Sequence, residues 1–176
     1  MKIGMVLEGG AMRGMYTAGV LDVFLDKDIK VDGIIGVSAG VLFGVNYCSK
    51  QRGRALRYNK RFCKDKNYMS LYSLIKTGNL VNKQFAFYDV PMIHDVFDTE
   101  EYRKSKTKFY ATVTNVKTGL AEYIELDDII AQMEVLRATG AMPYVSQIVD
   151  YKDSYILEQE YDSILNNLNL KQMPKD

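Results

Sequence analysis

The ten residues VDGIIGVSAG, from Val31 to Gly40, decide the fold of this chain. Val31–Ile35 is an apolar run bounded by glycine, which is typical of a buried strand. A G-x-S-x-G sequence comes next, and Ala39–Lys50 then has apolar residues at helical spacing. A serine in such a strand-to-helix turn is typical of a nucleophile elbow, which exposes the hydroxyl at the top of a sheet. We therefore predict Ser38 as a catalytic nucleophile. The predicted elbow around it consists of Gly36, Val37, Ala39 and Gly40.

A second glycine-rich turn lies earlier in the chain, after the apolar run Ile3–Leu7. Small residues let backbone N–H groups converge on an anion, and acyl transfer needs such donors at its tetrahedral oxyanion. A dinucleotide-binding G-x-G-x-x-G sequence is the other interpretation, but its second glycine is replaced by Ala11. The turn therefore predicts an oxyanion hole made of Gly9, Gly10, Ala11, Met12, Arg13 and Gly14.

A serine nucleophile needs a base within hydrogen-bond reach. The one histidine, His94, stands in a polar segment after Pro91 with no motif around it, so we interpret it as a structural residue. This interpretation favours a serine–carboxylate dyad whose general base is unknown. The alternative for the two turns is a glycine-bounded fold feature without catalysis.

The order of apolar patterns predicts an α/β domain. Strands at Lys2–Leu7 and Val31–Gly36 alternate with helices at Met15–Asp26 and Ala39–Lys50, which predicts a right-handed crossover and a parallel sheet. Tyr16, Val20, Val23 and Phe24 are predicted to form the apolar face of the first helix. Further on we expect a hairpin of Lys106–Asn115 with Ala121–Leu126, a helix Asp127–Thr139, strands Val145–Asp150 and Ser154–Leu157, and a final helix Glu158–Leu170.

Bulk composition narrows the function classes. The 176 residues are enough for one domain, residues 1–176, and 47% of them are hydrophobic. A net charge of +1 gives no overall case for nucleic acid, and the two cysteines form no disulfide framework. We find no secretory signal and no apolar run near the roughly 20 residues that span a bilayer, so we expect a cytoplasmic protein that contacts membranes peripherally.

The segment Gln51–Lys66 is strongly basic, with seven Arg and Lys residues against the single acid Asp65. A solvated helical face, contact with anionic lipid head groups and nucleic-acid binding are the three interpretations. The second would make Arg52–Lys66 the membrane-contacting part of the chain.

Taken together, the two turns resemble those of the bacterial patatin-like phospholipases. Thr114–Gly119 and Leu136–Pro143 also resemble stretches of that family. The resemblance implies a three-layer α/β/α fold with a mostly parallel central sheet. It also implies a serine lipid acyl hydrolase, a phospholipase or esterase, with Ser38 as nucleophile and Gly9–Gly14 as oxyanion hole. Lipid acyl esters are the implied substrates, and neither a metal nor an organic cofactor is implied.

One family motif is missing. The family's second catalytic residue is the aspartate of D-G-G or D-G-A after a short strand, whereas here Glu158-Gln159-Glu160 follows Ser154–Leu157. We therefore expect the family domain to be truncated after about residue 157, either because a segment is absent from this sequence or because the protein has lost its base. In the second case the chain turns over poorly. The alternative function is then a catalytically silent relative that binds lipid or a protein partner.

Overall fold

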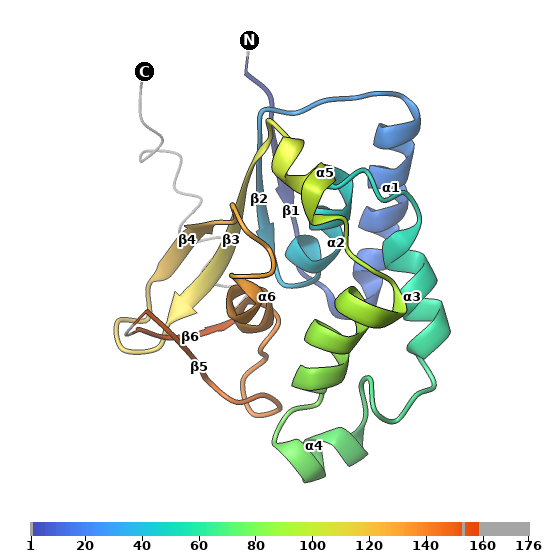
Figure 1. Cartoon of the computed structure of the whole chain (residues 1–176). Helices are drawn as coiled ribbons and strands as arrows, with labels where there is room; N and C mark the ends of the chain where they lie inside the picture. Colours follow the sequence, from blue (N-terminus) through green and yellow to red (C-terminus); the bar gives the residue numbers. More distant parts are fainter. Residues whose placement is uncertain (1, 153, 159–176) are drawn as a thin grey trace.

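The computed structural model describes residues 2–152 and 154–158, and it contains one six-stranded mixed sheet (Figure 1). The strands are β1 (Gly4–Leu7), β2 (Gly33–Val37), β3 (Lys108–Asn115), β4 (Ala121–Glu125), β5 (Val149–Tyr151) and β6 (Ser154–Glu158). They run in the order β1-β2-β3-β6-β5, and β4 also pairs with β3. The pairs β1–β2 and β2–β3 are parallel, whereas the remaining pairs are antiparallel. The expected α/β class is confirmed, and the arrangement is consistent with the three-layer α/β/α fold.

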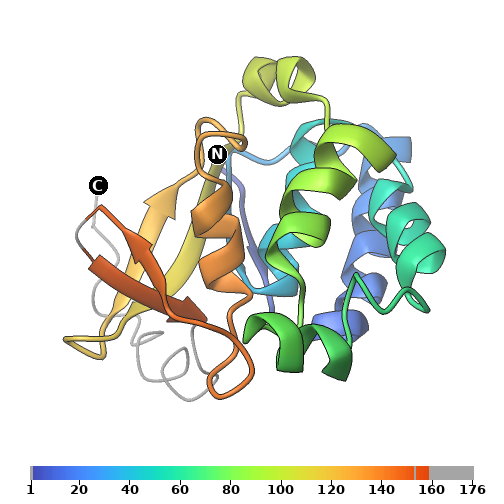
Figure 2. The same ribbon diagram turned by 60° about the horizontal axis from the view of Figure 1, so that its bottom comes forward.

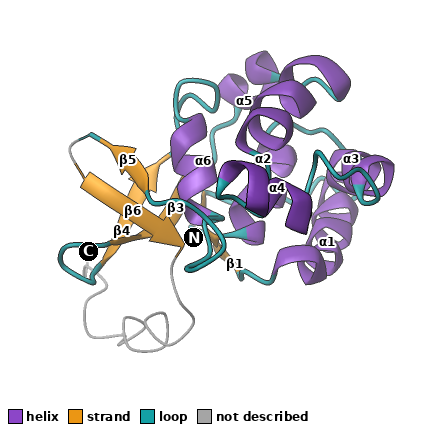
Figure 3. Ribbon diagram, turned by 90° about the horizontal axis from the view of Figure 1, so that it is seen from below, coloured by secondary structure: helices purple, strands orange, loops and turns teal. Residues whose placement is uncertain are grey.

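Helices connect and cover the strands. They are the 3-10 helix η1 (Ala11–Gly14), α1 (Met15–Asp26), α2 (Ala39–Cys48), α3 (Arg54–Phe62), α4 (Leu71–Thr77), the π-helix η2 (Phe85–His94), α5 (Thr99–Lys104) and α6 (Met133–Thr139). Helix α2 packs on β1, β2 and β3, and α6 packs on β3, β5 and β6. Helices α1 and α3 pack around α2 (Figure 2). Seen from below, β3, β4, β5 and β6 lie at one side of the molecule, with α6 between them and the other helices (Figure 3).

The central core forms where α2 meets the sheet. Leu7, Ile34, Val41 and Phe109 are buried together there. A Cβ atom on Gly44 would lie 2.5 Å from Leu7 Cδ1, so only a glycine allows this helix so close to the sheet. The close approach places the first residue of α2 directly above the ends of β1 and β2.

Three of the four residues predicted for the apolar face of α1 are wrong, whereas the fourth, Phe24, does pack against the central core. Tyr16, Val20 and Val23 are 82%, 37% and 51% exposed, and the buried residues of α1 are Ala18 and Leu21. Helix α1 packs on α2 and α3, where the small Ala18 lies in the contact, while its Leu21 reaches the core at the sheet. Apolar spacing alone did not distinguish these two faces.

Helix α6 begins at Met133 rather than at the predicted Asp127. The Asp128 carboxylate accepts the backbone N–H groups of Ile130 and Ala131, and the Gln132 amide oxygen accepts those of Asp127 and Asp128. These local side-chain bonds replace the backbone bonds of a helix, so residues 127–132 form turns instead.

Other boundaries also differ from the prediction. The strand predicted at Val145–Asp150 is reduced to β5, and Glu158 ends β6 rather than opening a helix. The rest of that predicted helix, residues 159–170, lies outside the described residues. Helix η2 was not predicted because it contains Pro91.

Candidate active site

Ser38 has the backbone of a strained elbow. It lies between β2 and α2 with φ 49° and ψ −121°, a conformation that residues with side chains rarely adopt. Such a conformation costs on the order of 1–3 kcal/mol and persists only where the surrounding structure enforces it. The residue is buried, with 6% of its surface exposed.

Glycine at position 40 allows this turn to form. A Cβ atom on Gly40 would lie 2.3 Å from the carbonyl oxygen of Leu7, at the end of β1. Gly36 is similarly constrained, since its Cβ would lie 3.0 Å from the backbone nitrogen of Val41. The first turn of α2 therefore packs against bare backbone on both sides.

The Gly9–Gly14 turn lies against the serine. A Cβ atom on Gly9 would be 3.1 Å from Ser38 Cβ, while Gly10 and Ala11 have the positive φ values 152° and 46°. The backbone N–H of Arg13 donates to the carbonyl of Gly10 at 2.9 Å. That bond engages the Arg13 N–H within the turn. Gly14 packs closely on α2, because its Cβ would lie 2.9 Å from that of Ala39.

Thr139 holds the elbow in place, and the sequence analysis did not single it out. Its hydroxyl oxygen accepts the backbone N–H of Ser38 at 2.9 Å, and the same hydroxyl donates to the carbonyl of Thr112 at 2.9 Å. Thr139 is fully buried at the end of α6. One side chain thus ties the serine to both α6 and β3.

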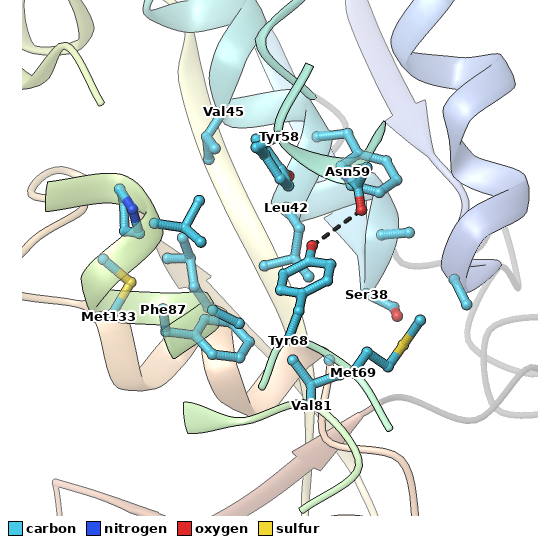
Figure 4. A pocket seen from close by; sticks show the side chains of 18 of the residues that line it. Ser38, Leu42, Val45, Tyr58, Asn59, Tyr68, Met69, Val81, Phe87 and Met133 are labelled. Atoms are coloured by element: carbon cyan, nitrogen blue, oxygen red, sulfur yellow. Dashed lines mark hydrogen bonds between the residues drawn. The ribbon is translucent and has the colours of Figure 1, made fainter. Parts of the chain in front are cut away.

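An apolar cavity of about 140 Å³ opens at Ser38 (Figure 4). Ala11 and Met12 of the glycine-rich turn border it beside the serine. Much of its wall comes from α2, α3, η2 and α6, and includes Leu42, Val45, Phe87, Val90, Met133 and Leu136, while connecting segments contribute Tyr68, Met69 and Val81. An ester whose apolar part entered this cavity would reach the serine hydroxyl.

Besides Ser38, four polar side chains interrupt the apolar wall: Arg54, Tyr58, Asn59 and Tyr68. The Tyr68 hydroxyl donates to the Asn59 amide oxygen at 3.0 Å (Figure 4). The Asn59 amide nitrogen in turn donates to the carbonyl of Ala55. Burial raises the pKa of Tyr58 to about 12 and also raises the pKa of Tyr68. Both phenols are therefore neutral near pH 7, and neither can act as a general base.

The basic segment is only partly a solvated face. Arg54 is 4% exposed and borders the cavity, where it donates to Asn46 Oδ1 at 2.8 Å and to the carbonyl of Asp95 at 3.0 Å. Burial lowers its pKa. Arg57 pairs with the Asp95 carboxylate at 2.7 Å, and Arg52 pairs with Asp26 at 2.6 Å. Two carboxylates distant in sequence, Asp26 and Asp95, thus pair with three of the seven cations of this segment.

His94 is packed away from the serine. Its ring lies 5.4 Å from the rings of both Phe62 and Phe85, and it is not among the residues that border the cavity. Within residues 2–152 and 154–158, no three His, Cys, Asp or Glu side chains are close enough to hold a metal ion.

Glu158 is a carboxylate that the topology brings towards the elbow. It pairs in register with Val113 on β3, and the preceding residue Thr112 pairs with Val37, which is next to Ser38. The backbone N–H of Glu158 donates to the carbonyl of Ala141 just after α6. One carboxylate oxygen is buried.

Comparison with known proteins decides the family. Residues 5–162 match the sequence profile of patatin-like phospholipases. The chain belongs to the patatin-like phospholipase family. This patatin-like chain is 26% identical over 162 residues to a patatin-like phospholipase domain-containing protein of Caenorhabditis elegans, covering 88% of this chain and 14% of that protein. It is 24% identical over 157 residues to neuropathy target esterase sws of Drosophila melanogaster, covering 89% of this chain and 11% of the fly protein.

A third relative is the uncharacterized protein YjjU of Escherichia coli, 32% identical over 82 residues, which cover 46% of this chain and 23% of that protein. The patatin-like chain thus spans less than a quarter of each of these three relatives. Because they come from a nematode, a fly and a bacterium, they support the family but not the narrower bacterial group that the sequence suggested. Among the described helices of the patatin-like chain, none is both long enough and apolar enough to cross a bilayer.

Proposed function

We propose that the chain is a serine acyl hydrolase acting on lipid acyl esters, with Ser38 as its nucleophile. The strained backbone of Ser38 at the mouth of an apolar cavity carries this proposal. Strain of this kind is concentrated at functional sites, where it aims a reactive group. The family assignment and the esterase among the relatives support the same class of reaction.

In the proposed reaction the Ser38 hydroxyl oxygen attacks the ester carbonyl carbon while its proton passes to a base. The oxyanion that forms is held by backbone N–H groups of the Gly9–Met12 turn. Expulsion of the alcohol, which regains the proton, leaves an acyl group on Ser38. Water then attacks the acyl group with the same base assisting, and the free acid leaves.

We further propose the Glu158 carboxylate as that base. The strand register supports it. The strands β2 and β6 flank β3, and Val37 of β2 pairs with Thr112 while Glu158 of β6 pairs with the next residue, Val113. Val113, the partner of Glu158 on β3, is buried against Ala138 of α6 and Ala141 just after it, so this side of β3 faces α6. A glutamate has one more methylene than an aspartate, so its carboxylate reaches further from the backbone.

The test combines covalent labelling with turnover. A fluorophosphonate probe should label the wild type but not Ser38→Ala, while Ser105→Ala, at the opposite end of β3, should be labelled normally. Hydrolysis of p-nitrophenyl butyrate should fall by about 10³ or more in Glu158→Gln, on the scale of losing a catalytic base. The matched control is Glu125→Gln, which removes an exposed carboxylate paired with Lys108 and should change little.

Two results would contradict these assignments. Labelling that persists in Ser38→Ala would show that another residue reacts. Labelling at Ser38 without turnover in wild type would favour the catalytically silent relative, with the cavity used for binding alone.

We also propose that anionic membranes are contacted by the exposed end of the basic segment. Lys60, Arg61, Lys64 and Lys66 are exposed, whereas Arg52 and Arg57 already have carboxylate partners. Exposed cations on one side of a protein are attracted to the negative surface potential of anionic lipids.

A further inference from the structure

We infer that this site selects short acyl groups, of about four to six carbons, over the long chains of ordinary phospholipids. The inference rests on the proposed function and concerns the same cavity. Its volume of about 140 Å³ is close to the roughly 150 Å³ of an apolar cavity that holds one benzene molecule. Six carbon atoms therefore come near to filling it.

The depth of the cavity agrees with this limit. Ser38 caps the N-terminus of α2, and Val45 borders the cavity seven residues further along that helix. At a rise of 1.5 Å per residue, the two positions are about 10 Å apart along the helix axis. An acyl chain with its carbonyl at Ser38 thus has about two turns of α2 to lie against.

A buried cation borders the cavity beside Val45. The Arg54 guanidinium lies next to Val45, because it donates to Asn46, the following residue of α2. It also donates to the carbonyl of Asp95. It also lies over the rings of Tyr58 and Phe97, at 5.2 and 5.4 Å from their centroids. A longer chain would have to displace this buried cation from all of its partners, which is costly in a site that excludes water.

The apolar wall predicts how rate depends on chain length. Each buried methylene contributes the equivalent of about a four-fold gain in binding. In a series of p-nitrophenyl esters, kcat/KM should therefore rise about fifteen-fold from acetate to butyrate, peak by hexanoate, and fall at decanoate and palmitate.

A matched pair of variants tests the cavity itself. Met133 borders it from α6, whereas Val135, on the same helix and also buried, does not. Met133→Ala should move the optimum to longer esters, and Val135→Ala should lower stability without moving it. An optimum at decanoate or longer in the wild type would overturn the inference, and so would an unchanged optimum in a folded Met133→Ala variant.

A binding measurement separates this inference from the proposed function. In Ser38→Ala, which cannot form the acyl-enzyme, hexanoate should raise Tm and laurate should not. That result without any ester hydrolysis by the wild type would sustain the size limit and refute only the hydrolase assignment. Laurate binding at least as strong as hexanoate, or no binding of either acid, would refute the size limit.

Discussion

Replacing Thr139 by valine tests whether one buried hydroxyl holds the elbow. Valine has nearly the same shape, but it cannot accept the N–H of Ser38 or donate to the carbonyl of Thr112, both now 2.9 Å from the hydroxyl oxygen. Position 139 is fully buried, so water cannot take the place of the lost partner.

The expected loss of stability in Thr139→Val follows from the Ser38 N–H group, which would lose its hydrogen-bond partner. A buried N–H without a partner costs about 1–3 kcal/mol, and the second lone pair of the Thr112 carbonyl adds less. A typical domain unfolds with only about 5–15 kcal/mol, so the loss is a substantial part of the total. With a urea m-value of about 1–3 kcal/mol per molar, the unfolding midpoint should fall by about 1 M.

The Thr139→Val change should also lower the rate at which Ser38 reacts. Without its anchor the strained turn can relax, and a displacement of about 1 Å can reduce a rate by about 10². We therefore expect fluorophosphonate labelling of Ser38 to slow by at least about ten-fold in Thr139→Val under conditions where the protein is folded.

Thr139→Ser is the control, because it keeps the hydroxyl and removes only a methyl group. It should be labelled at a rate close to that of the wild type. Equal labelling rates for the valine and serine variants, or a valine variant as stable as the wild type, would refute the anchoring role.

Four other predictions follow from the described contacts. Gly40→Ala should unfold or abolish labelling because its Cβ would lie 2.3 Å from Leu7 O, whereas Gly19→Ala, which meets nothing within 4 Å, should raise Tm through helix propensity. Burial raises the pKa of Tyr58 from 10 to about 12, so the stability contributed by its neutral phenol is complete below pH 10 and is lost as the pH rises to 12. The free energy of unfolding of Tyr58→Phe, measured in urea, should therefore depend less on pH between 10 and 12 than that of the wild type. Binding to anionic vesicles should weaken in Lys60→Glu/Lys64→Glu but not in Arg52→Gln, and binding to neutral vesicles equal to that of anionic ones would remove the membrane proposal. His94→Asn should leave kcat/KM within a few-fold, and a loss of about 10⁴ would instead assign a histidine mechanism.

The sequence predicted well those elements whose signal is local. The two glycine turns lie together at the ends of β1 and β2, as expected. Their glycines stand where the backbone has a positive φ or where a Cβ atom would come too close to a neighbour. The first two strands and the first two helices were located within a few residues, because apolar runs and helical spacing are also local signals. The hairpin of β3 and β4 was also predicted, from alternation on both sides of a turn.

Features that depend on distant contacts could not be predicted. The burial of Arg54 depends on Asp95, which lies 41 residues further along the chain, so a charge count over Gln51–Lys66 could not reveal it. Thr139 stands in an ordinary helical pattern, and only the packing of α6 against β3 makes its hydroxyl an anchor. The outward face of α1 was misjudged because the pattern cannot tell which neighbour a helix will meet.

Because Ser38 has a positive φ, the fold should be more stable with glycine at this position. Glycine adopts such torsions freely, so Ser38→Gly should release the 1–3 kcal/mol of strain and lose less than that through the greater freedom of the unfolded chain, for a net gain on the order of 1 kcal/mol. The most stable version of this protein is therefore one that has no hydroxyl at the mouth of its cavity. Under the proposed function, serine at position 38 lowers stability in return for reactivity, in a domain whose total margin is small.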